Sequence, residues 1–225
     1  MTSIVTTEYT IDKIAAPSLP LAPDEWDRRF QDQYSNVLRL YFNRLDDFIA
    51  RLQTSTGGAG IQLPYGAFSS DQNQTTTANT ATLMTLNTTD FASGVSISSS
   101  KIRVVNAGIY NLQFSAQFQN TDNQIQDISI WLRQGNDGGT SADIAGSTGF
   151  VSIPARKSAS PGEEAHEIIG WNYYLSMAVD DYAQIYWSAT NASVTIQAYP
   201  TSTGPVRPST QSVVATLSFV SALPT

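Results

Sequence analysis

Residues 108–118 read Gly-Ile-Tyr-Asn-Leu-Gln-Phe-Ser-Ala-Gln-Phe, and this segment is the strongest indication of the fold class. Every second residue from Leu112 to Phe118 is apolar. Successive side chains of a β-strand point to opposite faces, so this spacing produces one apolar and one polar face. We therefore predict a strand with its apolar face against a core.

The same alternation recurs in both directions along the chain. About nine or ten strands without an intervening helical pattern predict a mainly β domain, a sandwich or jelly roll. Shorter strands are predicted at 94–98, 101–105 and 194–199, whereas the polar residues 68–80 are expected to be extended and solvated. The longer alternating sets are Ile128, Ile130 and Leu132; Ile169, Trp171, Tyr173, Leu175 and Met177; Ala183, Ile185 and Trp187; and Val213, Ala215, Leu217 and Phe219.

Composition excludes several classes of protein. The 225 residues include no Cys and one His, carry a net charge of −7 and are only 14% charged. The lack of Cys excludes disulfides, thiol catalysis and Cys-based zinc sites. No apolar run is long enough for a membrane span, and the acidic balance argues against nucleic-acid binding. The first residues lack the basic and apolar regions of a secretory signal.

Charge is unevenly distributed and suggests segment boundaries. Of residues 1–53, 14 are charged, against 17 of residues 54–225. Prolines at 17, 20 and 23 set off an N-terminal arm, and Gly57, Gly58 and Gly60 indicate a linker. The predicted organisation is an arm at 1–23, a helical stalk at 24–53, a glycine-rich linker at 54–64 and a β-rich head at 65–225.

The segment before the linker has helical periodicity. Asp24-Glu25-Trp26-Asp27 follows Pro23 and offers favourable first-turn residues, and no Gly or Pro interrupts the chain up to Gln53. A heptad reading places Gln31, Leu38, Leu45 and Leu52 at a, and Tyr34, Tyr41 and Phe48 at d. Aromatic d positions favour a three-stranded coiled coil. The alternative is a helix that lies on the β-domain of its own chain. The residues expected at the trimer interface are Tyr34, Leu38, Tyr41, Leu45, Phe48 and Leu52.

Several motifs resemble those of C1q/TNF-like jelly-roll heads. The pattern Gly108-x-Tyr110-x-x-x-Phe114-Ser115 resembles one strand of that family. The run from Leu175 to Trp187 resembles its turn into a later strand, with Asp180 where the family usually has Gly.

A closer resemblance is to C1q-like heads in virion proteins of marine tailed phages, of the cyanophage type. It rests on the order of the motifs and covers about residues 24–220. It implies a homotrimer of jelly rolls around a threefold axis, in a fibre or spike exposed on the virion. The matching segments are Leu38–Phe42, Tyr65–Phe68, Gly94–Ile97, Gly108–Gln117 and Ile128–Arg133, whereas the hairpin Gln134–Ser141 departs from the phage pattern.

Catalytic and metal-binding patterns are weak. The single His166 lies in Glu163-Glu-Ala-His-Glu167, which is not a zinc-protease motif, and we expect a solvated loop histidine there. Adjacent acids at 163/164 and 180/181 are the candidates for a glycan hydrolase, but surface charge is the simpler interpretation. We expect no enzyme activity, no cofactor and no metal site. Trp187 and Tyr199 can stack on sugars, although core packing is the expected role.

The sequence therefore favours a mechanical and adhesive protein. The arm residues Ile4, Val5, Tyr9 and Ile11 are predicted to dock on another virion protein as an added strand. Loop residues Asn136, Asp137 and Asp143 are candidate distal contacts and possible oxygen ligands for Ca²⁺. The expected partners are two further copies and host-surface polysaccharide, without nucleic acid or membrane insertion. Alternatives are capsid decoration or a tail joint, a glycan hydrolase, and a secreted C1q-like signalling module, against which the missing signal counts.

Overall fold

A computed structural model describes residues 16–52, 63–160 and 162–223. The chain divides into two compact units, Met1–Gln62 and Leu63–Thr225, and each is described here by itself. The boundary between them falls inside the predicted 54–64 linker, most of which lies outside the described residues. No helix among the described residues is long and apolar enough to cross a membrane.

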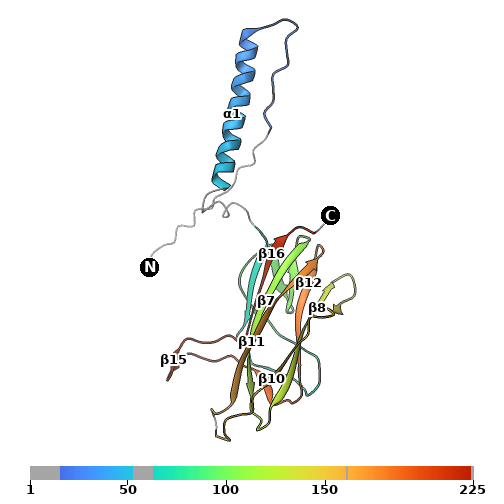
Figure 1. Cartoon of the computed structure of the whole chain (residues 1–225), viewed down its shortest axis with the longest axis vertical. Coiled ribbons are helices and arrows are strands. Elements are labelled where there is room, and N and C mark those ends of the chain that lie inside the picture. Colours follow the sequence, from blue (N-terminus) through green and yellow to red (C-terminus); the bar gives the residue numbers. More distant parts are fainter. Residues whose placement is uncertain (1–15, 53–62, 161, 224–225) are drawn as a thin grey trace. The chain divides into compact units, whose positions relative to one another are not determined.

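The first unit contains one helix, α1 (Arg28–Leu52) (Figure 1). It begins later than predicted, because Asp24–Asp27 precede it and do not form its first turn. Asp27 is instead the N-cap: its carboxylate accepts a hydrogen bond from Arg29 N at 2.8 Å, and its carbonyl accepts one from Gln31 N at 3.1 Å. An Asp side chain satisfies an N–H that the first turn would leave unpaired, which favours this position.

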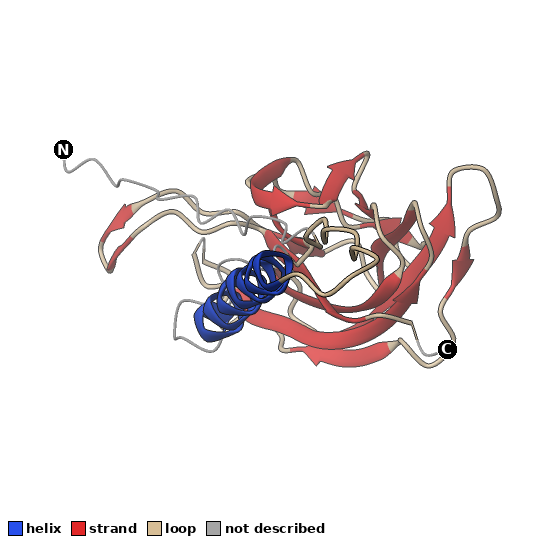
Figure 2. Ribbon diagram, turned by 90° about the horizontal axis from the view of Figure 1, so that it is seen from above, coloured by secondary structure: helices blue, strands red, loops and turns tan. Residues whose placement is uncertain are grey.

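The second unit, the head, is mainly β and consists of antiparallel ladders in two seven-stranded sheets (Figure 2). Sheet A has the order β2 (Gln74–Thr75), β13 (Val194–Ile196), β7 (Gly108–Asn120), β16 (Val213–Ser221), β1 (Tyr65–Ser70) and β4 (Thr88–Ser93), with β11 (Ala165–Met177) on the other side of β7. Sheet B has the order β10 (Gly149–Ile153), β8 (Gln126–Asn136), β12 (Asp181–Ala189), β6 (Lys101–Val104) and β5 (Val95–Ser98), with β3 (Thr82–Leu83) on β12 and β9 (Ala142–Asp143) on β8. A separate two-stranded sheet pairs β14 (Ser202–Thr203) with β15 (Val206–Arg207).

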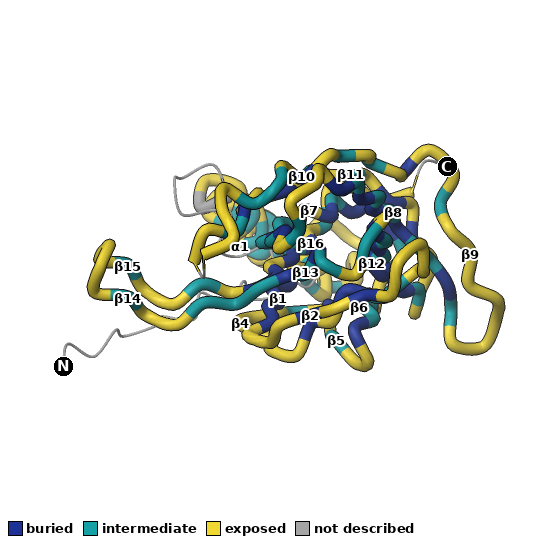
Figure 3. Tube along the Cα trace, turned by 90° about the horizontal axis from the view of Figure 1, so that it is seen from below, coloured by how far each residue is buried: buried dark blue, intermediate teal, exposed yellow. Residues whose placement is uncertain are grey.

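The core lies between the two sheets and is filled by the alternating residues that the sequence singled out. Phe118 on β7 and Trp187 on β12 meet across it at 5.6 Å in an edge-to-face contact, and both are fully buried. The predicted role of Trp187 in core packing is therefore confirmed. Figure 3 shows the buried positions concentrated along the central strands of both sheets. Each strand buries one face because apolar area removed from water stabilises the sandwich by about 25 cal/mol per Å².

The expectation that residues 68–80 are solvated is wrong for residues 68–70, 74 and 76, which are buried, and holds for the others, which are exposed. Phe68, Ser69 and Ser70 belong to β1, which lies between β16 and β4, and all three are buried. The side chain of Gln74 is also buried. Its amide donates to Thr85 O at 2.9 Å and its oxygen accepts from Thr85 N at 2.8 Å. Polar residues remain in the interior here because their hydrogen bonds are satisfied.

The turn before β12 uses Asp180 where the resembled family has Gly. Asp180 has a φ of +63°, a left-handed conformation that Asp tolerates better than most residues. Its N–H donates to Val104 O at 3.1 Å, and the next carboxylate, Asp181, accepts from Ala178 N at 2.9 Å. The turn therefore accommodates a non-glycine residue at a left-handed position.

Candidate functional site

The outer face of sheet A is formed by the residues of β7 and β11 that alternate with the core residues. Gln113 faces Asn172 across the ladder, and Ser115 faces Gly170. Of the twelve outward positions on these two strands, one is a histidine, His166, and none carries a carboxylate, ammonium or guanidinium group. The others are uncharged amides, hydroxyls, glycine and apolar side chains. The outward positions are Ile109, Asn111, Gln113, Ser115, Gln117 and Gln119 on β7, and His166, Ile168, Gly170, Asn172, Tyr174 and Ser176 on β11.

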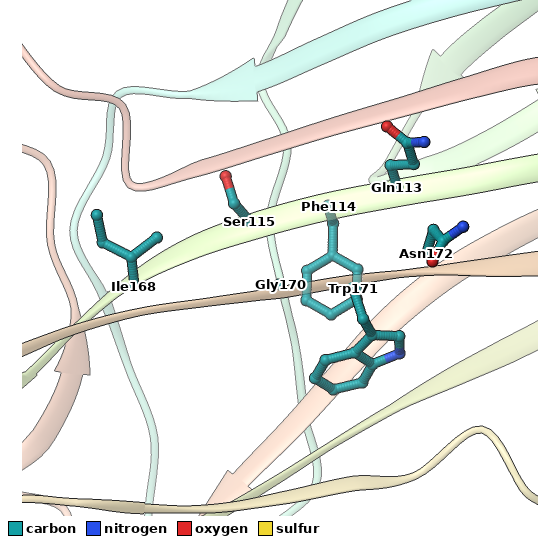
Figure 4. Close-up of a pocket in the computed structure, with 7 residues that line it drawn as sticks. All are labelled: Gln113, Phe114, Ser115, Ile168, Gly170, Trp171 and Asn172. Carbon is teal, nitrogen blue, oxygen red and sulfur yellow. The ribbon is translucent and has the colours of Figure 1, made fainter.

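A shallow groove of about 460 Å³ lies in the middle of this face and is centred on Gly170. A Cβ at residue 170 would collide with the carbonyl oxygen of Phe114, so the close β7–β11 approach requires glycine. Figure 4 shows the rings of Phe114 and Trp171 pointing away from Ser115 and Ile168. The groove is lined by Gln113, Phe114, Ser115, Ile168, Gly170, Trp171 and Asn172.

The floor of the groove is aromatic and its walls are polar without charge. The rings of Phe114 and Trp171 meet edge to face at 4.7 Å beneath it. Gln113, Asn172 and Ser115 supply amide and hydroxyl groups, and Ile168 is 65% exposed on the rim. Such a site can hydrogen-bond neutral polar groups and pack a small apolar group. It offers no group for acid–base chemistry.

The base of the head is the end at which β1 begins and β16 ends, and the far end is the end opposite to it (Figure 1). The far end carries the loops 121–125, 154–160 and 190–193. Asn120 is fully buried and donates from Nδ2 to Gln124 O and Pro154 O, both at 2.9 Å. The Asp122 carboxylate accepts from Gln126 Nε2 at 2.8 Å and Asn191 Nδ2 at 3.2 Å. These hydrogen bonds tie the three loops into one polar platform.

His166 lies within β11, so the prediction of a loop histidine is wrong. It is exposed on the outer face of sheet A and shares a hydrogen bond of 3.0 Å between Nδ1 and the Tyr199 hydroxyl. Tyr199 is half-buried outside the core, and the Arg207 guanidinium lies 5.3 Å from its ring centre. Burial raises the pKa of Tyr199, and Glu164 raises it further. Core packing was therefore the wrong expectation for Tyr199, because the chain leaves the sheet after Ile196.

The candidate contact residues Asn136, Asp137 and Asp143 have partners within the head. The two carboxylates pair with cationic side chains, and Asn136 bonds Asp181 at the start of β12. Lys101 Nζ donates to Asp137 at 2.8 Å, Arg103 also bonds Asp137, and Arg133 Nε donates to Asp143 at 2.7 Å. The hydrogen bond from Lys101 holds the pKa of Asp137 below 3.8, and the one from Arg133 does the same for Asp143.

These loop oxygens do not converge on a common centre. Asn136 Nδ2 donates to Asp181 at 3.3 Å, while the two carboxylates face separate cations. Among the residues that the structure describes, no group of three His, Cys, Asp or Glu side chains can hold a metal ion.

The strand register places this loop at the base of the head and not at its far end. Asn136 pairs with Asp181, Asp180 N bonds Val104 O, and Val105 N bonds Gly94 O beside the first strand. The prediction that these residues form distal contacts therefore does not fit the topology. Their role in binding a partner stays a prediction.

The two paired carboxylates, Asp137 and Asp143, give the loop a pH dependence with a definite sign. A carboxylate with a lowered folded pKa contributes stability above its ordinary pKa and loses it as the pH falls through the folded value. We expect amide protection of residues 137–143 to be high at about pH 5 and to fall below about pH 3.8. Hydrogen exchange followed by mass spectrometry checks this. The Asp137→Asn/Asp143→Asn control should be weakly protected at both pH values, and equal protection of the unaltered loop at pH 5 and pH 3 would contradict the expectation.

The candidate hydrolase carboxylates have local structural contacts. Asp181 accepts from Gln134 Nε2 at 3.0 Å and from the turn N–H of Ala178, and Asp180 forms the left-handed turn position. Glu164 accepts from Gly162 N at 3.3 Å, and backbone hydrogen bonds lower its pKa. A general acid needs a raised pKa, so Glu164 is poorly suited to that role.

The predicted stalk residues form one stripe on α1. Tyr34, Leu38, Tyr41, Leu45 and Phe48 are half-buried, whereas most of the intervening positions are exposed. Leu52 is the last residue of the helix, and its side chain lies outside the described set. The arm residues Ile4, Val5, Tyr9 and Ile11 also lie outside the described residues.

Sequence reasoning missed the groove residues Gln113, Ser115, Ile168, Gly170 and Asn172. A signal was present, because they occupy the positions that alternate with the core residues and carry no charge. The pairing of β7 with β11 could not be read from either strand alone, since periodicity sets the faces of a strand but not its neighbour.

No protein-family model matches this chain, and no curated protein sequence is similar to it. Among solved structures, the chain is similar to one described as "Globular Domain of Zebrafish Complement 1qA protein". The TM-score is 0.42 at 12% sequence identity, and the alignment covers 72% of this chain and 100% of that chain. The likeness is a weak one to a C1q globular domain.

Proposed function

We propose that this chain is a structural virion protein of a tailed phage. It forms a trimeric fibre or spike that is fixed by its N-terminal arm and displays a jelly-roll head for attachment to host-surface glycans. The carrying observation is the apolar stripe on α1. Its residues recur every three or four positions, yet no described side chain of the helix is buried. Such a stripe is stabilised when copies of the helix pack together.

The strand order supports a jelly-roll head. Eight of the strands form β1-β16-β7-β11 in sheet A and β6-β12-β8-β10 in sheet B. The first and last of these eight, β1 and β16, are neighbours. Successive strands of the eight switch between the sheets, except for β8 and β10, which pair with each other in sheet B, as in an eight-stranded jelly roll. The phage assignment is supported by the order of the sequence motifs from Tyr65 to Arg133.

Host attachment is assigned to the far end of the head. The loops there are held together by Asn120 and Asp122, so they present a preorganised polar surface. These loops carry Asp122, Arg156 and Lys157 among mostly uncharged side chains. Hydrogen bonds from the uncharged side chains suit neutral sugar hydroxyls and depend little on salt, unlike charge contacts, which are screened within about 8 Å at physiological ionic strength. Three heads on one stalk multiply weak contacts by avidity.

Adsorption of the labelled full chain to host cells tests this function. We expect saturable binding that changes little between about 0.05 and 0.5 M salt and is lost when the surface polysaccharide is stripped. Ile125 at the far end is 65% exposed, and Ile125→Asp should weaken binding about tenfold, or roughly 1.4 kcal/mol. The matched control is Val179→Asp at the base, where Val179 is 56% exposed.

Other outcomes of this assay favour other functions. Binding to purified phage particles but not to host cells would favour capsid decoration or a tail joint, with the head on another virion protein. Release of reducing ends from host polysaccharide would favour the hydrolase. Equal loss of binding in the Ile125 and Val179 variants would contradict attachment through the far end.

A further inference from the structure

The hairpin β14–β15 stands apart from both main sheets (Figures 1 and 2). Its tip, residues 201–206, reads Thr-Ser-Thr-Gly-Pro-Val and carries no charge. Val206 at the tip is 87% exposed. An isolated two-stranded hairpin is only marginally stable in water. Contact of its exposed apolar tip with another surface would therefore stabilise it.

The base of this hairpin is nevertheless firmly held. Tyr199 and Thr210 exchange two backbone hydrogen bonds of 3.0 and 2.8 Å. Arg207 donates to Pro200 O at 3.0 Å and lies over the Tyr199 ring. The Tyr199 hydroxyl is in turn bonded to His166 on β11. These contacts fix the direction in which the hairpin leaves the sandwich.

The hairpin rises from the outer face of sheet A. The chain leaves and returns on the β13/β16 side of β7, where Gln117 O accepts from Gln197 N at 2.8 Å and Gln117 N donates to Ser212 O at 2.9 Å. β11 lies on the other side of β7. Because the Tyr199 hydroxyl reaches His166 on β11, its side chain crosses the outer face of β7. The groove at Gly170 lies on the same face, further along β11.

The hairpin tip does not reach the groove of its own copy. The hairpin projects away from the sandwich in both views (Figures 1 and 2), and none of its residues lines the groove. The exposure of Val206 agrees with a tip that touches nothing in its own head.

We propose that the hairpin tip of one copy occupies the Gly170 groove of a second copy. Both surfaces are uncharged, so their contact desolvates no ion. Pro205 and Val206 would pack against Ile168, while Gln113 and Asn172 would hydrogen-bond the polar backbone of the turn. A tip on one copy and a groove on the next form a head-to-tail contact, and in the proposed trimer three such contacts close into a ring. The inference rests on the proposed trimer and assigns one contact within it.

Cross-linking in the full chain tests this contact, because the natural sequence contains no Cys. Val206→Cys combined with Ile168→Cys places thiols on the tip and on the groove rim, and both positions are too exposed to disturb the core. With a short bismaleimide we expect covalent trimers on a denaturing gel, at least tenfold above the control. The control is Val206→Cys with Phe150→Cys, since Phe150 is 69% exposed on sheet B.

Sedimentation of the same samples separates this inference from the proposed function. A chain that sediments as a trimer without cross-links above the control overturns the inference, leaves the trimer intact and frees the groove for a neutral glycan. A monomer in sedimentation overturns the proposed trimer and the contact with it. A cross-link between positions 168 and 206 of one chain, identified by mass spectrometry, overturns the inference because the tip then reaches its own groove.

Discussion

Trp187→Ala is expected to destabilise the head by about 3–5 kcal/mol, the usual cost of deleting a buried Trp. Trp187 is fully buried and packs against Phe118 from the opposite sheet, so its removal leaves a cavity in the middle of the core. For a domain of this size the midpoint of thermal unfolding should fall by about 10 °C. Near-ultraviolet circular dichroism during heating measures it.

An exposed aromatic residue of the same head provides the control for this substitution. Phe150 is 69% exposed, and Phe150→Ala should change stability by no more than about 0.5 kcal/mol. A Trp187→Ala protein with an unchanged unfolding midpoint but no glycan binding would contradict the core role. It would instead support the alternative that Trp187 stacks on a sugar ring.

Leu45→Asp is expected to convert the trimer to a monomer. In the proposed stalk Leu45 takes an a position, so three carboxylates would meet in one layer of the bundle. The loss of leucine burial, about 1.5–3 kcal/mol per chain, adds to the desolvation of buried charge. Association should weaken by at least about 100-fold, as measured by sedimentation equilibrium at micromolar concentration.

The matched control adds the same charge to an exposed position of α1. Asn43 is exposed, so Asn43→Asp should leave the trimer unchanged. If Leu45→Asp also sediments as a trimer, the helix does not assemble the chain. The alternative in which α1 lies on the β-domain of its own chain then gains support.

Local sequence was sufficient to predict which face of each long strand is buried. Leu112, Ile130 and Leu217 were assigned to the core from spacing alone, and all three are buried. The reason is that alternation of side chains is a property of a single extended strand and needs no partner. The start of α1 was predicted less accurately. Whether Asp27 lies in the first turn or is the N-cap depends on which backbone N–H donates to its carboxylate.

Polar composition misled the prediction for β1. Residues 68–70, Phe-Ser-Ser, are followed by a polar stretch that is typical of solvated chain. They nevertheless lie in β1, between β4, which follows soon after in the sequence, and β16, the last strand of the chain. Ser212 supplies part of the reason, since its N–H and hydroxyl both donate to Ser70 O, at 2.8 and 3.0 Å. Those two residues are 142 positions apart, so no local window contains both.

The pattern of apolar residues was enough to predict a mainly β protein with one amphipathic helix and a core of alternating apolar residues. The neighbours of each strand and their register became known only from the folded head. That register places Gly170 opposite Ser115 to form the groove, and Asp137 beside Lys101 at the base of the head. Periodicity is a property of each strand alone, whereas pairing depends on how all strands together bury their apolar faces and satisfy their backbone hydrogen bonds.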